Sequence, residues 1–80
     1  MIDIKVRYFA VFREERGLSE ETVQTESATA GQLYEELKAA HGFRLDPKLV
    51  RVAIQGAYVP MESPLQNGDE VVLIPPVAGG

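Results

Sequence analysis

One long amphipathic helix is predicted in this chain, and it limits the possible folds more than any other feature of the sequence. Thr29 and Gln32 have the spacing of a capping box, in which a hydroxyl and a side-chain amide bind unpaired N–H groups of the first turn. Leu33, Leu37 and Ala40 follow at the spacing of one helix face. A single helix must bury its apolar stripe against another layer, and the remaining patterns indicate that this layer is a sheet.

Strand patterns occupy most of the rest of the chain. Residues 2–8 alternate apolar and polar side chains, as expected of a strand with one buried face. Shorter strands are predicted at residues 21–26, 50–54, 58–59 and 70–74, and a short helix at residues 9–16. The segment 70–74 shows little alternation, which is typical of a strand in the middle of a sheet. The element order predicts an α+β fold, with a mixed sheet packed on one main helix.

Two prolines end the last predicted strand. Pro75 and Pro76 have no backbone N–H to donate, so they cannot continue a sheet. We therefore expect one domain at residues 1–76 and a flexible tail at residues 77–80. The tail consists of Val77, Ala78, Gly79 and Gly80.

Composition argues against several classes of function. The sequence has no cysteine and one histidine, so we expect no bound metal or cofactor and no cysteine nucleophile. Adjacent acidic residues, such as Glu35 and Glu36, point in different directions and make no facing catalytic pair. The net charge of −4 argues against nucleic acid as a partner. We expect no membrane span and no signal peptide, and hence a cytoplasmic protein.

The carboxylate of Gly80 is the candidate reactive group. A glycine pair has no Cβ, so it can enter a narrow active-site channel. The α-carboxyl group is ionised and unreactive until it is activated. Adenylation would convert it to a mixed anhydride that sulfur or nitrogen nucleophiles attack. We therefore interpret the chain as a carrier with no catalytic apparatus of its own.

Three motifs give the whole chain a resemblance to a known family. They are Tyr8-Phe9-Ala10-x-x-Arg13-Glu14-x-x-Gly17, Leu65-x-x-Gly68-Asp69-Glu70-Val71 and Pro75-Pro76-Val77-Ala78-Gly79-Gly80. With them the chain resembles the molybdopterin synthase small subunits (molybdopterin-converting factor subunit 1), which are sulfur carriers of the ubiquitin-like β-grasp superfamily. The resemblance implies a β-grasp fold for residues 1–76.

The resemblance also implies a reaction sequence and its partners. A ubiquitin-activating-like adenylyltransferase uses ATP to adenylate Gly80, and a sulfur-donating enzyme then converts the adenylate to a thiocarboxylate. Residues 77–80 next insert into the large synthase subunit, which holds the catalytic residues. Two sulfur transfers turn precursor Z (cyclic pyranopterin monophosphate) into the dithiolene of molybdopterin. The expected assembly is a heterotetramer of two small and two large subunits.

The family further implies an apolar patch beside the tail that docks both partners. The matching positions are Phe9, Tyr58 and Ile74, next to Pro75 and Pro76. Ile74 is aliphatic at a position where the family also commonly has an aromatic residue.

Three alternatives stay open at this point. A thiamine-pathway sulfur carrier shares the glycine pair, but it is usually shorter and lacks the helix predicted at residues 9–16. A ubiquitin-like modifier would form isopeptide bonds through the same carboxylate. A β-grasp protein-interaction module would not need a free Gly80.

Overall fold

The computed structural model describes residues 1–76, and its elements follow the predicted order. They are β1 (Ile2–Tyr8), α1 (Val11–Arg16), β2 (Glu20–Thr25), α2 (Ala30–His41), the 3-10 helix η1 (Pro47–Leu49), β3 (Arg51–Ile54), β4 (Ala57–Val59) and β5 (Glu70–Ile74). The tail predicted at residues 77–80 lies outside the described residues. Its separation from the domain at residues 1–76 therefore stays a prediction.

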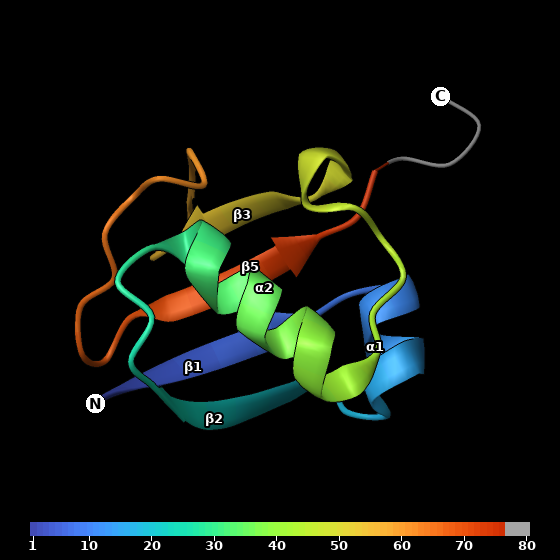
Figure 1. Ribbon diagram of the computed structural model, residues 1–80, viewed down its shortest axis with the longest axis horizontal. Coiled ribbons are helices and arrows are strands. Elements are labelled where there is room, and N and C mark those ends of the chain that lie inside the picture. Colours follow the sequence, from blue (N-terminus) through green and yellow to red (C-terminus); the bar gives the residue numbers. More distant parts are fainter. Residues whose placement is uncertain (77–80) are drawn as a thin grey trace.

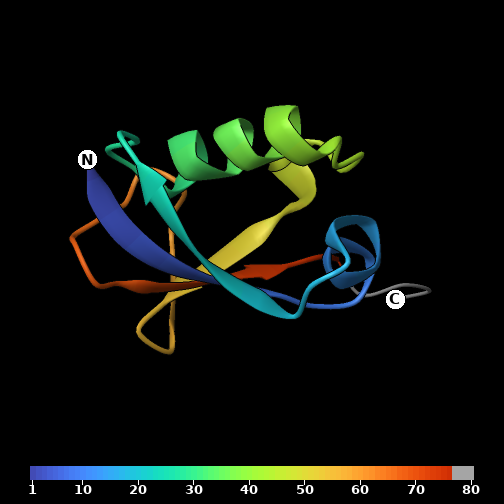
Figure 2. The ribbon, with the colours of Figure 1, turned by 90° about the horizontal axis from the view of Figure 1, so that it is seen from below.

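The five strands form one mixed sheet in the order β2-β1-β5-β3-β4. β1 and β5 run parallel, and the other neighbours are antiparallel. β5 is the central strand, as its weak alternation predicted: Val71 and Leu73 are buried, and Val72 and Ile74 on the opposite face are partly buried. Helix α2 crosses one face of this sheet, so the molecule has two layers (Figures 1 and 2).

The capping box of α2 forms with a shift of one residue. The Thr29 hydroxyl accepts a hydrogen bond from the Gln32 N–H at 3.2 Å, as predicted. The Gln32 side-chain oxygen accepts from the N–H of Ala28, at 2.7 Å, instead of from that of Thr29. Gly42 ends the helix with φ of 72°, a left-handed conformation that glycine adopts without steric cost.

The buried stripe of α2 differs from the predicted one. Leu33 and Leu37 are buried, but Ala40 is exposed, so its predicted place in the stripe is wrong. Ala30 and Tyr34 are buried in its place. The four buried positions follow the i, i+3, i+4, i+7 pattern, in which the large ring of Tyr34 sets the direction of the stripe.

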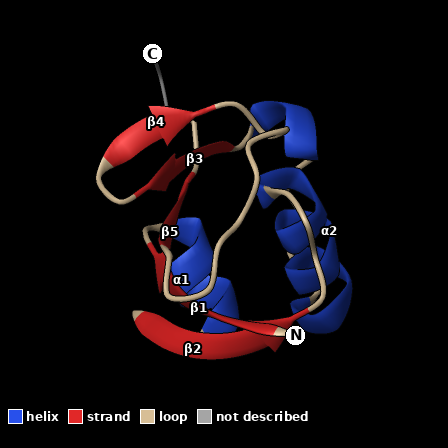
Figure 3. Cartoon of the chain, turned by 90° about the vertical axis from the view of Figure 1, so that its left-hand side faces the viewer, coloured by secondary structure: helices blue, strands red, loops and turns tan. Residues whose placement is uncertain are grey.

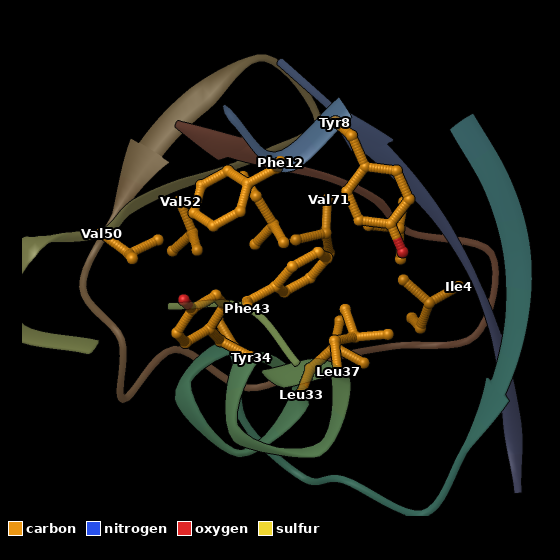
Figure 4. Close-up of a cluster of buried hydrophobic side chains, with 13 residues drawn as sticks. Ile4, Tyr8, Phe12, Leu33, Tyr34, Leu37, Phe43, Val50, Val52 and Val71 are labelled. Carbon is orange, nitrogen blue, oxygen red and sulfur yellow. The ribbon is translucent and has the colours of Figure 1, made fainter. Parts of the chain in front are cut away.

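Aromatic rings fill the core between α1 and α2. The Phe43 ring lies 5.8 Å from that of Tyr8, 5.2 Å from that of Phe12 and 6.2 Å from that of Tyr34, measured between centroids (Figure 4). Phe12 comes from α1, so its burial anchors that short helix to the end of the sheet. Tyr8, just before Phe9 in the sequence, and Phe12, just after it, therefore both anchor this end of β1 in the core.

Candidate functional site

The sheet face opposite α2 carries no helix in the described part of the chain (Figure 2). Strand register places Arg7 beside Val72, Val72 beside Ala53, and Ala53 beside Tyr58. These four residues make a row across β1, β5, β3 and β4, whose arrangement Figure 3 shows end on. We call this surface the open face, and it comprises Arg7, Phe9, Arg51, Ala53, Tyr58, Val72 and Ile74.

A hollow on the open face brings together four of the five predicted docking residues. Tyr58, Ile74, Pro75 and Pro76 line it together with Arg51, and its volume is about 420 Å³. The Tyr58 side chain is on the edge strand β4, and the residue is 71% exposed. An aromatic ring so exposed beside partly buried aliphatic groups is typical of a recognition surface. Pro76, the last described residue, borders the hollow.

Phe9, the fifth predicted docking residue, lies outside the lining of this hollow. It follows Tyr8, whose register partner is Leu73, so it stands at the end of β1 beside the end of β5. The residue is 44% exposed, and the Arg7 guanidinium lies over its ring at 5.7 Å from the centroid. Phe9 therefore adds a second exposed aromatic group to the open face, one strand away from the hollow.

A tight turn at Ala10 separates the exposed Phe9 from the buried Phe12. Ala10 has φ of 51° and ψ of −121°, the first central position of a type II′ turn, which favours glycine. The Phe12 N–H donates to the Phe9 carbonyl at 3.1 Å and closes the turn. α1 consequently begins at Val11, two residues later than predicted. The strained turn leaves Phe9 at the surface while Phe12 enters the core.

A polar cluster fixes the same end of the sheet. The Tyr8 hydroxyl donates to the Glu21 carboxylate at 2.6 Å, which joins β1 to β2. Hydrogen bonds from Arg16 hold the pKa of Glu21 below its ordinary value. Burial, with the bond to Glu21, raises the pKa of Tyr8 well above that of a free tyrosine. At neutral pH the Glu21 carboxylate is thus ionised and is bound by the Tyr8 phenol and the Arg16 guanidinium. These bonds hold this end of the sheet together.

The described residues offer recognition more than chemistry. Within residues 1–76 no group of three or more histidine, aspartate or glutamate side chains is placed to hold a metal ion. None of the described helices is both long and apolar enough to cross a membrane. The predicted reactive and inserting residues, Val77, Ala78, Gly79 and Gly80, lie outside the described part of the chain.

Sequence reasoning missed the two arginines of the open face. The arginines of the chain look scattered along the sequence, and Arg7 and Arg51 are 44 positions apart (51 minus 7). The available signal was alternation, because each occupies an exposed position of a predicted strand. Their proximity depends on β5 lying between β1 and β3, which no local pattern reveals.

These features define a ubiquitin-like β-grasp domain: a mixed sheet, a single long helix across one side of it, and the open face on the other side. The chain belongs to the ThiS family, whose sequence profile matches residues 6–80. The predicted fold class is thereby confirmed.

Individual relatives agree with this assignment. The chain is 39% identical over 84 residues to the molybdopterin synthase sulfur carrier subunit of Chlamydomonas reinhardtii, covering 99% of this chain and 100% of the relative. The solved structure of a putative molybdopterin converting factor, subunit 1, from Pyrococcus furiosus is similar at 34% identity and a TM-score of 0.78, over 96% of this chain and 100% of that one. A chain in the complex of subunits 1 and 2 of the molybdopterin-converting factor from Helicobacter pylori shares the fold, with a TM-score of 0.67 and 21% identity. The match covers 99% of this chain and 100% of that one.

Proposed function

We propose that this chain is the sulfur carrier subunit of a molybdopterin synthase. The observation that carries the proposal is the end-to-end similarity to a molybdopterin synthase sulfur carrier subunit at 39% identity. The glycine pair after Pro75 and Pro76 supports it, because a carrier needs a reactive end without side chains. In this role the chain is not an enzyme by itself, and it contributes a chemical group to a partner's active site.

The proposed chemistry takes place at the carboxylate of Gly80. One carboxylate oxygen attacks the α-phosphorus of ATP in the active site of an adenylyltransferase, and pyrophosphate leaves. Hydrosulfide supplied by a sulfur-donating enzyme then attacks the acyl carbon, and AMP leaves, which yields the thiocarboxylate. The thiocarboxylate sulfur bonds to a carbon of precursor Z, from which an oxygen leaving group departs. Water then hydrolyses the resulting thioester, which leaves a thiol on the pterin product and restores the carboxylate. A second loaded carrier completes the dithiolene of molybdopterin.

Two features of the chain suit this chemistry. It contains no cysteine, so no thiol of its own can capture the acyl adenylate. It has no cofactor to bind in this scheme, since the ATP belongs to the activating enzyme. Activation by ATP and a sulfur donor also favours a cytoplasmic location.

The open face is the proposed docking surface for the large synthase subunit. A stable interface buries about 1,600 Å², which is more than the insertion of residues 77–80 can supply. The folded domain must therefore contribute. Its open face offers two exposed aromatic residues, Phe9 and Tyr58, and the partly buried Ile74. Pro75 and Pro76 border the same hollow and set the direction in which the chain leaves the sheet. We propose a heterotetramer of two small and two large subunits.

Reconstitution of the synthase tests the proposal. The chain is incubated with an adenylyltransferase, ATP, a sulfur source, the large subunit and precursor Z, and molybdopterin is measured. The wild-type chain should give product, and chains that lack Gly80 or carry one residue after it should give none while keeping the same unfolding midpoint. Undiminished product from either variant, or conjugates to lysine side chains as the only product, would contradict the proposal.

A further inference from the structure

We infer that the large synthase subunit presents carboxylates to the open face, opposite Arg7 and Arg51. The inference rests on the proposed function, because it assigns the chemistry of the partner that docks there. The chain carries a net charge of −4. Two arginines nevertheless border the apolar part of its open face.

Arg51 borders two neighbouring hollows. It lines the hollow of about 420 Å³ with Tyr58 and Ile74, and it also lines a second one of about 310 Å³ with Tyr58 and Met61. Its register partner on β5 is Ile74, and the residue is exposed. A partner side chain that enters either hollow therefore meets Arg51.

Arg7 lies on β1, on the other side of β5 from Arg51. Its register partner is Val72, and its guanidinium rests over the ring of Phe9. One strand, β5, separates the strand of Arg7 from that of Arg51. Since neighbouring strands are 4.7–4.9 Å apart, the strands of the two arginines are about 10 Å apart. Ala53 is level with Arg7, so Arg51 is offset from Arg7 by two residues along the strands as well. The spacing suits two separate carboxylates on one partner surface.

The nearby carboxylates of this face are engaged by another cation. Lys5 lies 3.1 Å from Glu20 and 3.9 Å from Glu70, between their carboxylates. Among residues 1–76, no carboxylate lies within 4.0 Å of the charged nitrogens of Arg7 or Arg51. The planar guanidinium matches a carboxylate with two parallel hydrogen bonds, so each of these two arginines can bind a carboxylate of the partner.

The surroundings favour an acidic protein surface over a polyanion. Val72, Ala53 and Ile74 form an apolar strip between the two arginines, and a matching partner needs apolar groups of its own at that strip. The overall negative charge disfavours a nucleic acid. A protein groove that is apolar at its centre and acidic at its rim satisfies both conditions.

Association kinetics with the large subunit test the inference. The double variant Arg7→Glu, Arg51→Glu is compared with Arg7→Lys, Arg51→Lys and with the matched control Arg44→Glu. Arg44 follows α2, its side chain is 92% exposed, and its nearest carboxylate is that of Glu15 at 3.9 Å. The control reverses one charge away from the open face, a change of −2 against −4 for the double variant, so the single variants Arg7→Glu and Arg51→Glu are also compared with it. Association rates are measured at low and high salt, with an unfolding curve for each variant.

We expect charge reversal to slow association at least about 10-fold at low salt and to weaken its dependence on salt. The lysine pair should stay within about 3-fold of wild type, and Arg44→Glu within about 2-fold. If reversal lowers the unfolding midpoint, the pair Arg7→Gln, Arg51→Gln replaces it, with a smaller but still clear loss of rate expected.

The outcomes separate this inference from the proposed function. Wild-type binding and product formation, with open-face variants that associate like Arg44→Glu, would overturn the inference alone. Failure of the wild-type chain to bind the large subunit would overturn both. A dimer of this chain that dissociates when Arg51 is changed, with binding of the large subunit unaffected, would also overturn the assignment of the partner.

Discussion

Arg16 donates two hydrogen bonds to the carboxylate of Glu21, at 2.8 and 2.9 Å. Arg16 is the last residue of α1 and Glu21 is the second residue of β2, so the pair closes the turn between them. The Tyr8 hydroxyl donates to the same carboxylate and adds β1 to the connection. A polar contact at the margin of the core thus holds the end of the sheet at which Phe9 is exposed.

Replacing Glu21 with alanine should lower the free energy of unfolding by about 1–3 kcal/mol, because the buried Tyr8 hydroxyl and the Arg16 guanidinium lose their acceptor. Urea unfolding measures the effect. Glu20→Ala is the control, since Glu20 is exposed and makes only a surface ion pair with Lys5. Equal midpoints for the two variants would show that the Glu21 cluster contributes no more than a surface contact.

The protein should lose stability at alkaline pH, in part through Tyr34. Burial raises the pKa of Tyr34 to about 12, whereas an unfolded tyrosine has a pKa of about 10. Because the folded value is the higher one, the contribution of Tyr34 is complete below pH ~10 and is lost as the pH rises toward the folded value. Unfolding curves between pH ~8 and ~12 should show this decline, and Tyr34→Phe should reduce its slope. An identical slope in the variant would contradict the assignment.

Ala10→Gly should leave the protein at least as stable as the wild type. Glycine adopts the positive φ of this position without strain, a relief of about 1–3 kcal/mol that outweighs the entropy of a more flexible unfolded chain, about 0.4–1 kcal/mol. Ala39→Gly, at an exposed position of α2, should instead cost about 1 kcal/mol. If both variants lost the same stability, the turn at Ala10 would not be strained.

Local signals in the sequence predicted the elements, and long-range pairing decided the rest. The Thr29 cap and the glycine at position 42 act within a few residues, so their roles were readable from the sequence. The stripe of α2 had two solutions, and the volume of Tyr34 selected the one that excludes Ala40. The role of Arg51 depends on Ile74, its register partner in β5, which lies 23 positions later in the chain (74 minus 51). No pattern in the segment around Arg51 contains that information.

Tyr58→Ala should weaken binding of the large subunit by about 2 kcal/mol and change the stability of the fold little, because the residue is 71% exposed. Phe9→Ala should act in the same direction. Leu49→Ala is the control: this residue is 53% exposed, but it belongs to η1 and not to the open face. Calorimetric titration is run beside unfolding curves. Equal losses of binding and stability would assign Tyr58 and Phe9 to the fold and remove them from the docking surface.

The intact mass of the chain after activation shows whether the Gly80 carboxylate carries sulfur. The purified protein is incubated with ATP, an adenylyltransferase and a sulfur source, and is then weighed and fragmented by mass spectrometry. We expect a gain in mass equal to the exchange of one oxygen for one sulfur, located at Gly80 and absent when ATP is omitted. An unchanged mass with an adenylyltransferase that loads a known sulfur carrier in the same mixture would contradict the claim that the Gly80 carboxylate carries sulfur.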